Sequence, residues 1–378
     1  MYKKLLALAT FSGTIIGVGL FGLPFVTAKV GFLPMVIYFL ILGGFIITIQ
    51  LMYGEISLRT KNNHRLPGYA SIFLNKKAAA VSYLSTFIGL TGSLLAYIIV
   101  GGEFLTNFLS PYLGGTQFFY SSLFFIVGAV IIYFGTGSVS KTEFFSIGLF
   151  FAILLVLLVK AAPHIQFQFF LENNVAQHFF LPYGVILFSL GGMAVIPEMR
   201  EILGRHERSL LPIIVIGTLI PMVTYLLFIV IIFGVTGPAT TPEGLLGFNR
   251  AAGGGVAQLG YLFGIITTFT SFLTLGITLK KEFHYDRGLP APLAWAIAVT
   301  PAYLIYLIGI ADFIGVIGFI GSVMLGIDTI MIMVIYLQAR KHSQRAPAYQ
   351  LNMSLPAILL ITSVFMVGIG LEIYSLLK

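Results

Sequence analysis

A glycine- and proline-rich run in the first apolar stretch limits most what this chain can fold into. Residues 13–24 read Gly-Thr-Ile-Ile-Gly-Val-Gly-Leu-Phe-Gly-Leu-Pro, where an unbroken membrane helix would otherwise be expected. Gly13 and Gly17 suit a close-packing face, but about 200° of helix rotation separates Gly17 from Gly19. Glycine loosens a helix and proline removes a backbone donor, so we expect a break. Unpaired backbone at membrane depth is tolerated where it lines a cavity, which indicates a binding site.

Composition places the chain in a lipid bilayer, because 58% of the residues are hydrophobic, 9% are charged and the mean hydropathy is +1.00. Tyr2-Lys3-Lys4 leads into a long apolar stretch without a cleavage motif, so no cleaved signal is expected. The net charge of +8 is spread through loops, which argues against nucleic acid as a partner. The chain has no cysteine, which excludes disulfides and thiolate metal sites.

Apolar runs of about 20 residues predict membrane helices, and we expect eleven of them. The predicted fold is an all-α membrane protein in which residues 1–378 form a single transmembrane transporter domain. The expected spans are residues 5–29, 32–58, 79–109, 117–135, 142–161, 179–203, 210–235, 255–280, 291–309, 312–337 and 353–376.

The basic residues predict the orientation of these spans. With the N-terminus in the cytoplasm, only Lys29, Lys160, Arg250 and Lys378 of the 21 Lys and Arg lie outside. Because cytoplasmic loops are enriched in Lys and Arg, we expect a multi-pass protein of the cytoplasmic (inner) membrane. Its N-terminus would be cytoplasmic and its C-terminus outside.

The sixth span repeats the irregularity of the first. Residues 188–198 read Phe-Ser-Leu-Gly-Gly-Met-Ala-Val-Ile-Pro-Glu, again a glycine break followed by proline. The two spans run in opposite directions and lie five spans apart, which predicts an inverted repeat. The repeats would be residues 5–161 and 179–337, with the helix at 353–376 outside them.

The two breaks offer backbone groups of both signs. We expect freed amides to hold a substrate carboxylate, and freed carbonyls to hold a cation or the substrate ammonium. An amino acid suits such a site better than a sugar or an inorganic anion. No countercharge is evident near the site, so the side chain is expected to be neutral. The amides are those of Val18, Gly19 and Leu20, and the carbonyls those of Gly13, Ile16, Ser189 and Leu190.

Hydroxyl groups of the eighth span suggest one kind of coupling ion. Thr267, Thr270 and Ser271 fall on one face of a helix. They either bond back to carbonyls of their own helix or bind sodium together with the carbonyls of Gly13 and Ile16.

Acidic residues within spans suggest a proton instead. Glu103 and Asp328 are candidate carriers, because a charge inside the membrane is costly and is usually functional. Lys160 either pairs with Glu103 or reaches the interface.

Catalytic and metal-binding motifs are lacking in the sequence, so no enzyme activity and no cofactor beyond the coupling ion, H⁺ or Na⁺, is expected. The alternative to a symporter is a gated channel or passive facilitator for a small zwitterionic solute. Such a protein would be expected to show rings of charge or a repeated filter loop, and neither is evident. The expected partners are an amino acid and the lipid bilayer, and the oligomeric state stays open.

Several of these motifs resemble those of the bacterial aromatic and hydroxy amino acid permeases, the tyrosine/tryptophan permease-like family. Residues 13–19 with Pro24 resemble that family's first helix, and Ala96-Tyr97-Ile98 with Gly102-Glu103 its third. The resemblance extends over the eighth to tenth helices, through Thr270-Ser271-Phe272-Leu273 with Gly276 and Lys281, and through residues 313–321 preceded by Pro301.

The resemblance implies the amino acid–polyamine–organocation superfamily fold, also seen in the bacterial leucine transporter, and symport by alternating access. It favours proton coupling, with Glu103 as the matching acid. It implies a first-helix carboxylate site, a sixth-helix site for the amine and side chain, and a cation position. The first-helix site comprises Thr14, Gly17, Val18, Gly19 and Leu20. The sixth-helix site comprises Ser189, Leu190, Gly191, Gly192 and Met193. The cation position comprises Gly13, Ile16, Thr267, Thr270 and Ser271.

One departure bears on selectivity. Family members often carry a Phe-His pair where this chain has Gly192-Met193. The change opens room for a bulkier side chain, so we expect an aromatic or other medium-to-large substrate.

Overall fold

The structure is built from helices. This computed structural model describes residues 2–135, 139–171, 178–252, 256–286 and 288–377, in which the regular elements are helical. The longer elements are α1 (Tyr2–Ile15), α2 (Gly19–Val30), α3 (Phe32–Arg59), α5 (Lys76–Leu113), α6 (Gln117–Phe134), α7 (Val139–Ala161), α9 (Leu181–Ser189), α11 (Leu210–Thr236), α13 (Val256–Lys281), α14 (Ala291–Leu307), α16 (Leu325–Lys341) and α17 (Leu355–Leu376). The shorter ones are α4 (Leu66–Phe73), α10 (Ile196–Leu203), α12 (Leu245–Ala252), α15 (Phe313–Phe319), the 3₁₀ helices η1 (Ala162–His164), η2 (Phe167–Leu171), η3 (Met193–Val195), η4 (Gly204–Ser209) and η5 (Gly237–Ala239), and the π-helical turns η6 (Glu282–Asp286) and η7 (Ile320–Met324).

Membrane-spanning length is common among these helices. Seven helical segments of the described residues are long and apolar enough to cross a membrane, and α1 with α2 make an eighth when the bent pair counts as one span. Each range that the sequence predicts as a span contains one of the helices or a helix pair, and most ends agree within a few residues.

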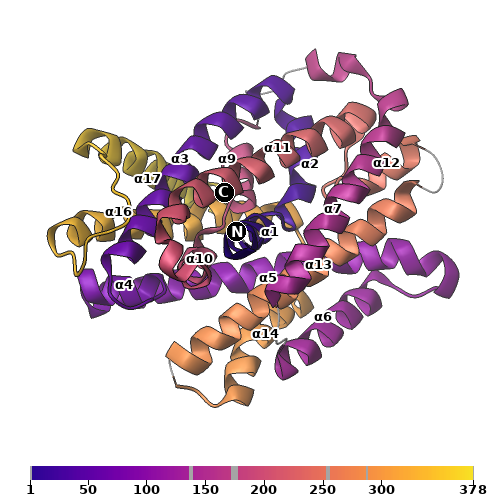
Figure 1. Ribbon diagram of the computed structural model, residues 1–378. Coiled ribbons are helices and arrows are strands. Elements are labelled where there is room, and N and C mark those ends of the chain that lie inside the picture. Colours follow the sequence, from indigo (N-terminus) through magenta and orange to yellow (C-terminus); the bar gives the residue numbers. More distant parts are fainter. Residues whose placement is uncertain (1, 136–138, 172–177, 253–255, 287, 378) are drawn as a thin grey trace.

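The first predicted break is a bend of 48° between α1 and α2. The second separates α9 from η3 and α10 at residues 190–192. Both broken helices lie inside the bundle: α1 packs against α7, α10 and α11, and α2 against α9 and α11. Figure 1 shows α1 near the middle of the molecule, with α7, α10 and α11 around it.

Small residues let α9 approach the π-helical turn η7. A Cβ on Gly321 would collide with the backbone of Gly184 and Phe188 in α9, and a Cβ on Gly184 would collide with Ser322 Oγ of η7 and with the backbone of Gly318 at the end of α15. This close contact places Ile320 and Met324 of η7 beside the second break. A π turn inside an α-helix often marks a functional site.

Candidate functional site

A cavity lies where the two helix breaks meet. Thr14, Gly17, Val18 and Gly19 line it from the first break. Ser189, Gly191, Gly192 and Met193 line it from the second. The fold therefore brings together most of the residues predicted to hold a substrate, although they come from chain segments far apart in the sequence.

Leu20 and Leu190 do not line this cavity, and their predicted backbone groups are already used. The amide of Leu20 donates to the carbonyl of Gly17 over 3.2 Å, because α2 begins with a tight turn. The carbonyl of Leu190 accepts from Gln50 Nε2 at 3.2 Å. Both leucine side chains are fully buried, which assigns them to packing.

The two breaks touch each other at Gly19 and Ser189. A Cβ atom on Gly19 would lie 2.5 Å from Ser189 Oγ and 2.8 Å from Ser189 Cα. These distances are shorter than van der Waals contact, so the approach requires glycine. Gly17 is confined in the same way by the hydroxyl of Tyr97.

Tyr97 of α5 reaches into the first break. Its hydroxyl lies against Gly17, close to the backbone of Val18 and the side chain of Ser271. The Val18 amide, predicted to bind a carboxylate, therefore faces a tyrosine hydroxyl at the wall of the cavity. Tyr97 was missed as a site residue. A tyrosine well inside a membrane span, away from the interface where tyrosine is common, is the signal that could have found it.

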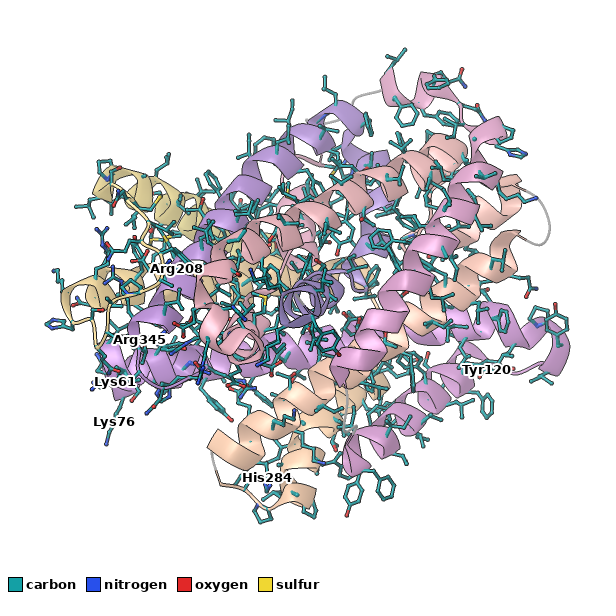
Figure 2. All side chains as sticks on the ribbon, in the orientation of Figure 1. Lys61, Lys76, Tyr120, Arg208, His284 and Arg345 are labelled. Carbon is teal, nitrogen blue, oxygen red and sulfur yellow. The ribbon has the colours of Figure 1, made fainter. Side chains whose placement is uncertain are left out.

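From the breaks the cavity extends toward the end of the bundle that carries Arg65. Tyr53, Arg65, Glu282 and Asp328 line this part. A second hollow shares Arg65 and Glu282 with it and reaches the exposed Lys76. Figure 2 places Lys61, Lys76 and Arg345 near one another at this end, with Tyr120 far from them. We call it the basic end.

Two carboxyl groups near the breaks correct the expectation that no countercharge lies there. Asp328 Oδ1 is buried without a hydrogen-bond partner among the described residues, the nearby Ser85 hydroxyl donates to the carbonyl of Met324, and Glu282 is an electrostatic neighbour of Asp328. Asp328 lies in α16 and Glu282 in η6, directly after α13, so only the fold reveals that they share a cavity. Arg65 Nη2 lies 3.0 Å from Glu198 Oε1, so Glu198 offsets its charge.

Aromatic side chains close the bundle on the other side of the breaks. The ring of Phe21 packs edge-on against Phe104, Phe228 and Phe263, with centroids 4.7, 5.8 and 5.9 Å apart. Phe21 follows the first break by two residues and is fully buried. The site is therefore connected to the basic end and sealed by a rigid cluster beyond the breaks.

The hydroxyl groups predicted to bind a cation make other contacts in the structure. Thr267 Oγ1 donates to the carbonyl of Phe263 and Thr270 Oγ1 to that of Ile266, at 2.8 and 2.9 Å. These are bonds within their own helix, the alternative that the sequence left open. The third member, Ser271, is bonded to Tyr97, and none of the three lines the cavity, nor do Gly13 and Ile16.

The two acidic candidates lie in different places. Asp328 lines the cavity, whereas Glu103 lies outside it, with the carboxyl group of Glu243 as an electrostatic neighbour. Glu243 is 3% exposed and accepts a hydrogen bond from Thr241 Oγ1 at 2.7 Å. Lys160 is exposed, and in the part of the chain that the structure describes no ion pair joins it to Glu103.

Comparison with known proteins identifies the family of the chain. The profile of the tryptophan/tyrosine permease family matches residues 2–374. The chain belongs to this family. The permease is also 24% identical over 300 residues to "Tyrosine-specific transport system 1" of Haemophilus influenzae, a match that covers 73% of this chain and 74% of the relative.

Among solved structures, the permease resembles the crystal structure of MhsT in complex with L-phenylalanine. The TM-score is 0.69 and the sequences are 16% identical, over 98% of each chain. This similarity shows the fold. Together with the family it makes the permease an amino acid transporter and an integral multi-pass membrane protein, not an enzyme.

Proposed function

We propose that this permease is an ion-coupled symporter of a neutral, medium-to-large amino acid, with an aromatic side chain preferred. The observation that carries the proposal is the cavity at the junction of the two breaks, where Gly17, Gly19, Gly191 and Gly192 leave the backbone bare. Discontinuous helices with unwound backbone are what transporters use to hold a small charged solute near the midplane.

The contacts suggest how the substrate lies. Its carboxylate would meet the amides of Val18 and Gly19 and the hydroxyl of Tyr97. Its side chain would extend among Met193, Ile320 and Met324, which line the cavity. Methionine adapts to varied shapes, which suits an aromatic or branched side chain. The phenylalanine in the MhsT complex and the tyrosine in the relative's name agree with this substrate class.

We further propose the leucine-transporter-type arrangement of eleven spans, with inverted repeats at 5–161 and 179–337 and an additional helix at 353–376. The two broken helices support it. The cluster of basic residues at one end supports a cytoplasmic position for that end and for the N-terminus. The cavity would then face the cytoplasm, and alternating access would open it to the other side.

Proton coupling is proposed over sodium coupling. Thr267, Thr270 and Ser271 do not line the cavity, which argues against a sodium ion bound beside the substrate there. Asp328 shares the cavity with the substrate, so it is a better placed carrier than Glu103.

Uptake into proteoliposomes tests the coupling ion. A pH gradient without sodium should drive accumulation of labelled tyrosine or phenylalanine, whereas a sodium gradient at constant pH should not. Asp328→Asn should lose gradient-driven accumulation and keep exchange, and Glu103→Gln tests the second acid in the same assay. Uptake that follows only the sodium gradient and is abolished by Thr270→Ala with Ser271→Ala would overturn proton coupling.

A gated channel or passive facilitator is the competing function. The aromatic cluster that packs around Phe21 beyond the first break favours a carrier, since a channel needs a continuous path. Counterflow decides: an unlabelled amino acid inside the vesicles accelerates entry of the labelled one only through a carrier cycle.

A further inference from the structure

Tyr225 of α11 connects the two helix breaks. Its hydroxyl lies 2.5 Å from the carbonyl oxygen of Ile15 and 3.0 Å from that of Ser189. These are the last residues of α1 and α9. The backbone of Gly17 lies close to the same hydroxyl, and the tyrosine is fully buried.

Carbonyl groups at helix ends carry partial negative charge, and two of them directed at one point repel each other. In transporters with broken helices such carbonyls often coordinate a cation. Here the positive end of an O–H dipole lies between them. The third carbonyl of this region, that of Leu190, likewise receives a neutral donor, the amide of Gln50.

We infer that Tyr225 is a positioning residue for substrate binding: its hydroxyl holds the first break in register with the second. One hydroxyl group donates toward the carbonyls of Ile15 and Ser189, so it connects both sides of the junction that lines the cavity. α11 suits this role because it is a continuous helix that packs against both α1 and α2. The effect on substrate affinity rests on the proposed function, whereas the effect on the breaks does not.

The test is Tyr225→Phe in the full-length protein, which removes the oxygen and keeps the ring. Two buried carbonyls would lose their donor. We expect the KM for labelled tyrosine or phenylalanine to rise about tenfold, which corresponds to about 1.4 kcal/mol, with Vmax changed less than threefold. Tyr183→Phe is the matched control, because the Tyr183 hydroxyl is buried without a hydrogen-bond partner among the described residues. Its KM should equal that of the wild type.

Hydrogen–deuterium exchange gives a readout that needs no substrate. In Tyr225→Phe, amides of residues 12–19 and 188–193 should exchange at least fivefold faster, while Tyr183→Phe leaves them unchanged. Equal exchange in both variants, or a KM within twofold of the wild type, overturns the inference. A wild type that binds no amino acid would instead refute the proposed function, and the exchange rates would still decide the role of Tyr225.

Discussion

The two helix breaks are packed differently. At the first, Gly17 abuts the Tyr97 hydroxyl and Gly19 abuts Ser189, so the backbone is enclosed on several sides. At the second, the nearest side-chain atom to a Cβ on Gly191 would be Leu325 Cδ1, 3.1 Å away, at the movable end of a side chain. In the proposed binding mode, the enclosed first break faces what all amino acids share, the carboxylate and Cα. The adaptable one lies where their side chains differ.

The largest effect is expected at the first break, from Gly19→Leu. A leucine side chain would overlap Ser189 and occupy the carboxylate position, so the breaks would be forced apart. We expect amino acid affinity to fall more than 100-fold in a thermal-shift or binding assay, while the protein still inserts because leucine suits a membrane helix.

Gly44→Leu is the control for this change. Gly44 lies in α3, is exposed on the described structure, and a Cβ there would meet no atom within 4 Å. The variant should bind substrate like the wild type. Binding by Gly19→Leu at wild-type strength would show that the carboxylate does not lie at the first break.

A smaller and more selective effect is expected at the second break. Gly191→Ala adds a methyl group 3.1 Å from both Leu325 Cδ1 and the carbonyl oxygen of Phe188, so the side chain of Leu325, which lines the cavity, must shift. We expect competition by phenylalanine and tyrosine to weaken about tenfold relative to competition by alanine and serine. Equal weakening for all four amino acids would place the side chain elsewhere.

Gly192 differs from its neighbour although both line the cavity. A Cβ on Gly192 would lie 2.5 Å from Ile15 Cγ1 and 3.0 Å from Phe11 Cε2. Part of the space that the sequence indicated at this position is therefore filled by α1. Gly192→Phe should reduce transport of every amino acid rather than shift the preference toward small ones.

Much of the helical framework could be predicted because lipid permits few alternatives: backbone groups must bond within their own helix, so apolar runs mark helices closely. The breaks at Gly17 and Gly191 were predictable for the same reason, since glycine and proline stand out against such a background. The helix α4 and the π-helical turn η7 were not predicted. A helix of eight residues within a loop and a single π-helical turn leave no comparable pattern in the sequence.

The site was predictable where it is made of backbone and not where it is made of distant side chains. The glycines of the two breaks were predicted from the sequence, and they line the cavity. Asp328 and Glu282 meet only through packing of α13 and α16 around α5, and Tyr97 reaches Val18 across the same packing. At Thr270 the sequence left two alternatives open, because a hydroxyl on a helix face has an acceptor in its own helix whatever lies opposite.

The smallest effect is expected at the support of the second break, in Thr218→Val. Thr218 Oγ1 lies 2.6 Å from Gln50 Oε1, which turns the Gln50 amide group toward the carbonyl of Leu190. Valine keeps the shape and removes the donor, so one buried acceptor loses its partner while Gln50 stays in place. Hydrogen bonds between membrane helices average about 0.6 kcal/mol.

We therefore expect Thr218→Val to lose about 1 kcal/mol or less of stability and less than threefold in substrate affinity, measured by thermal unfolding with and without phenylalanine. Thr224→Val is the control on the same helix. Both threonines are buried and donate to a carbonyl four residues back, Ile214 for Thr218 and Ile220 for Thr224, but in the described part of the chain only Thr218 also reaches Gln50. If Gln50 anchors the second break through Thr218, only Thr218→Val should weaken binding. Equal losses of substrate affinity in both variants would mean that the second break keeps its shape without the Thr218–Gln50 hydrogen bond. The backbone of this break would then be adaptable as well as its side chains.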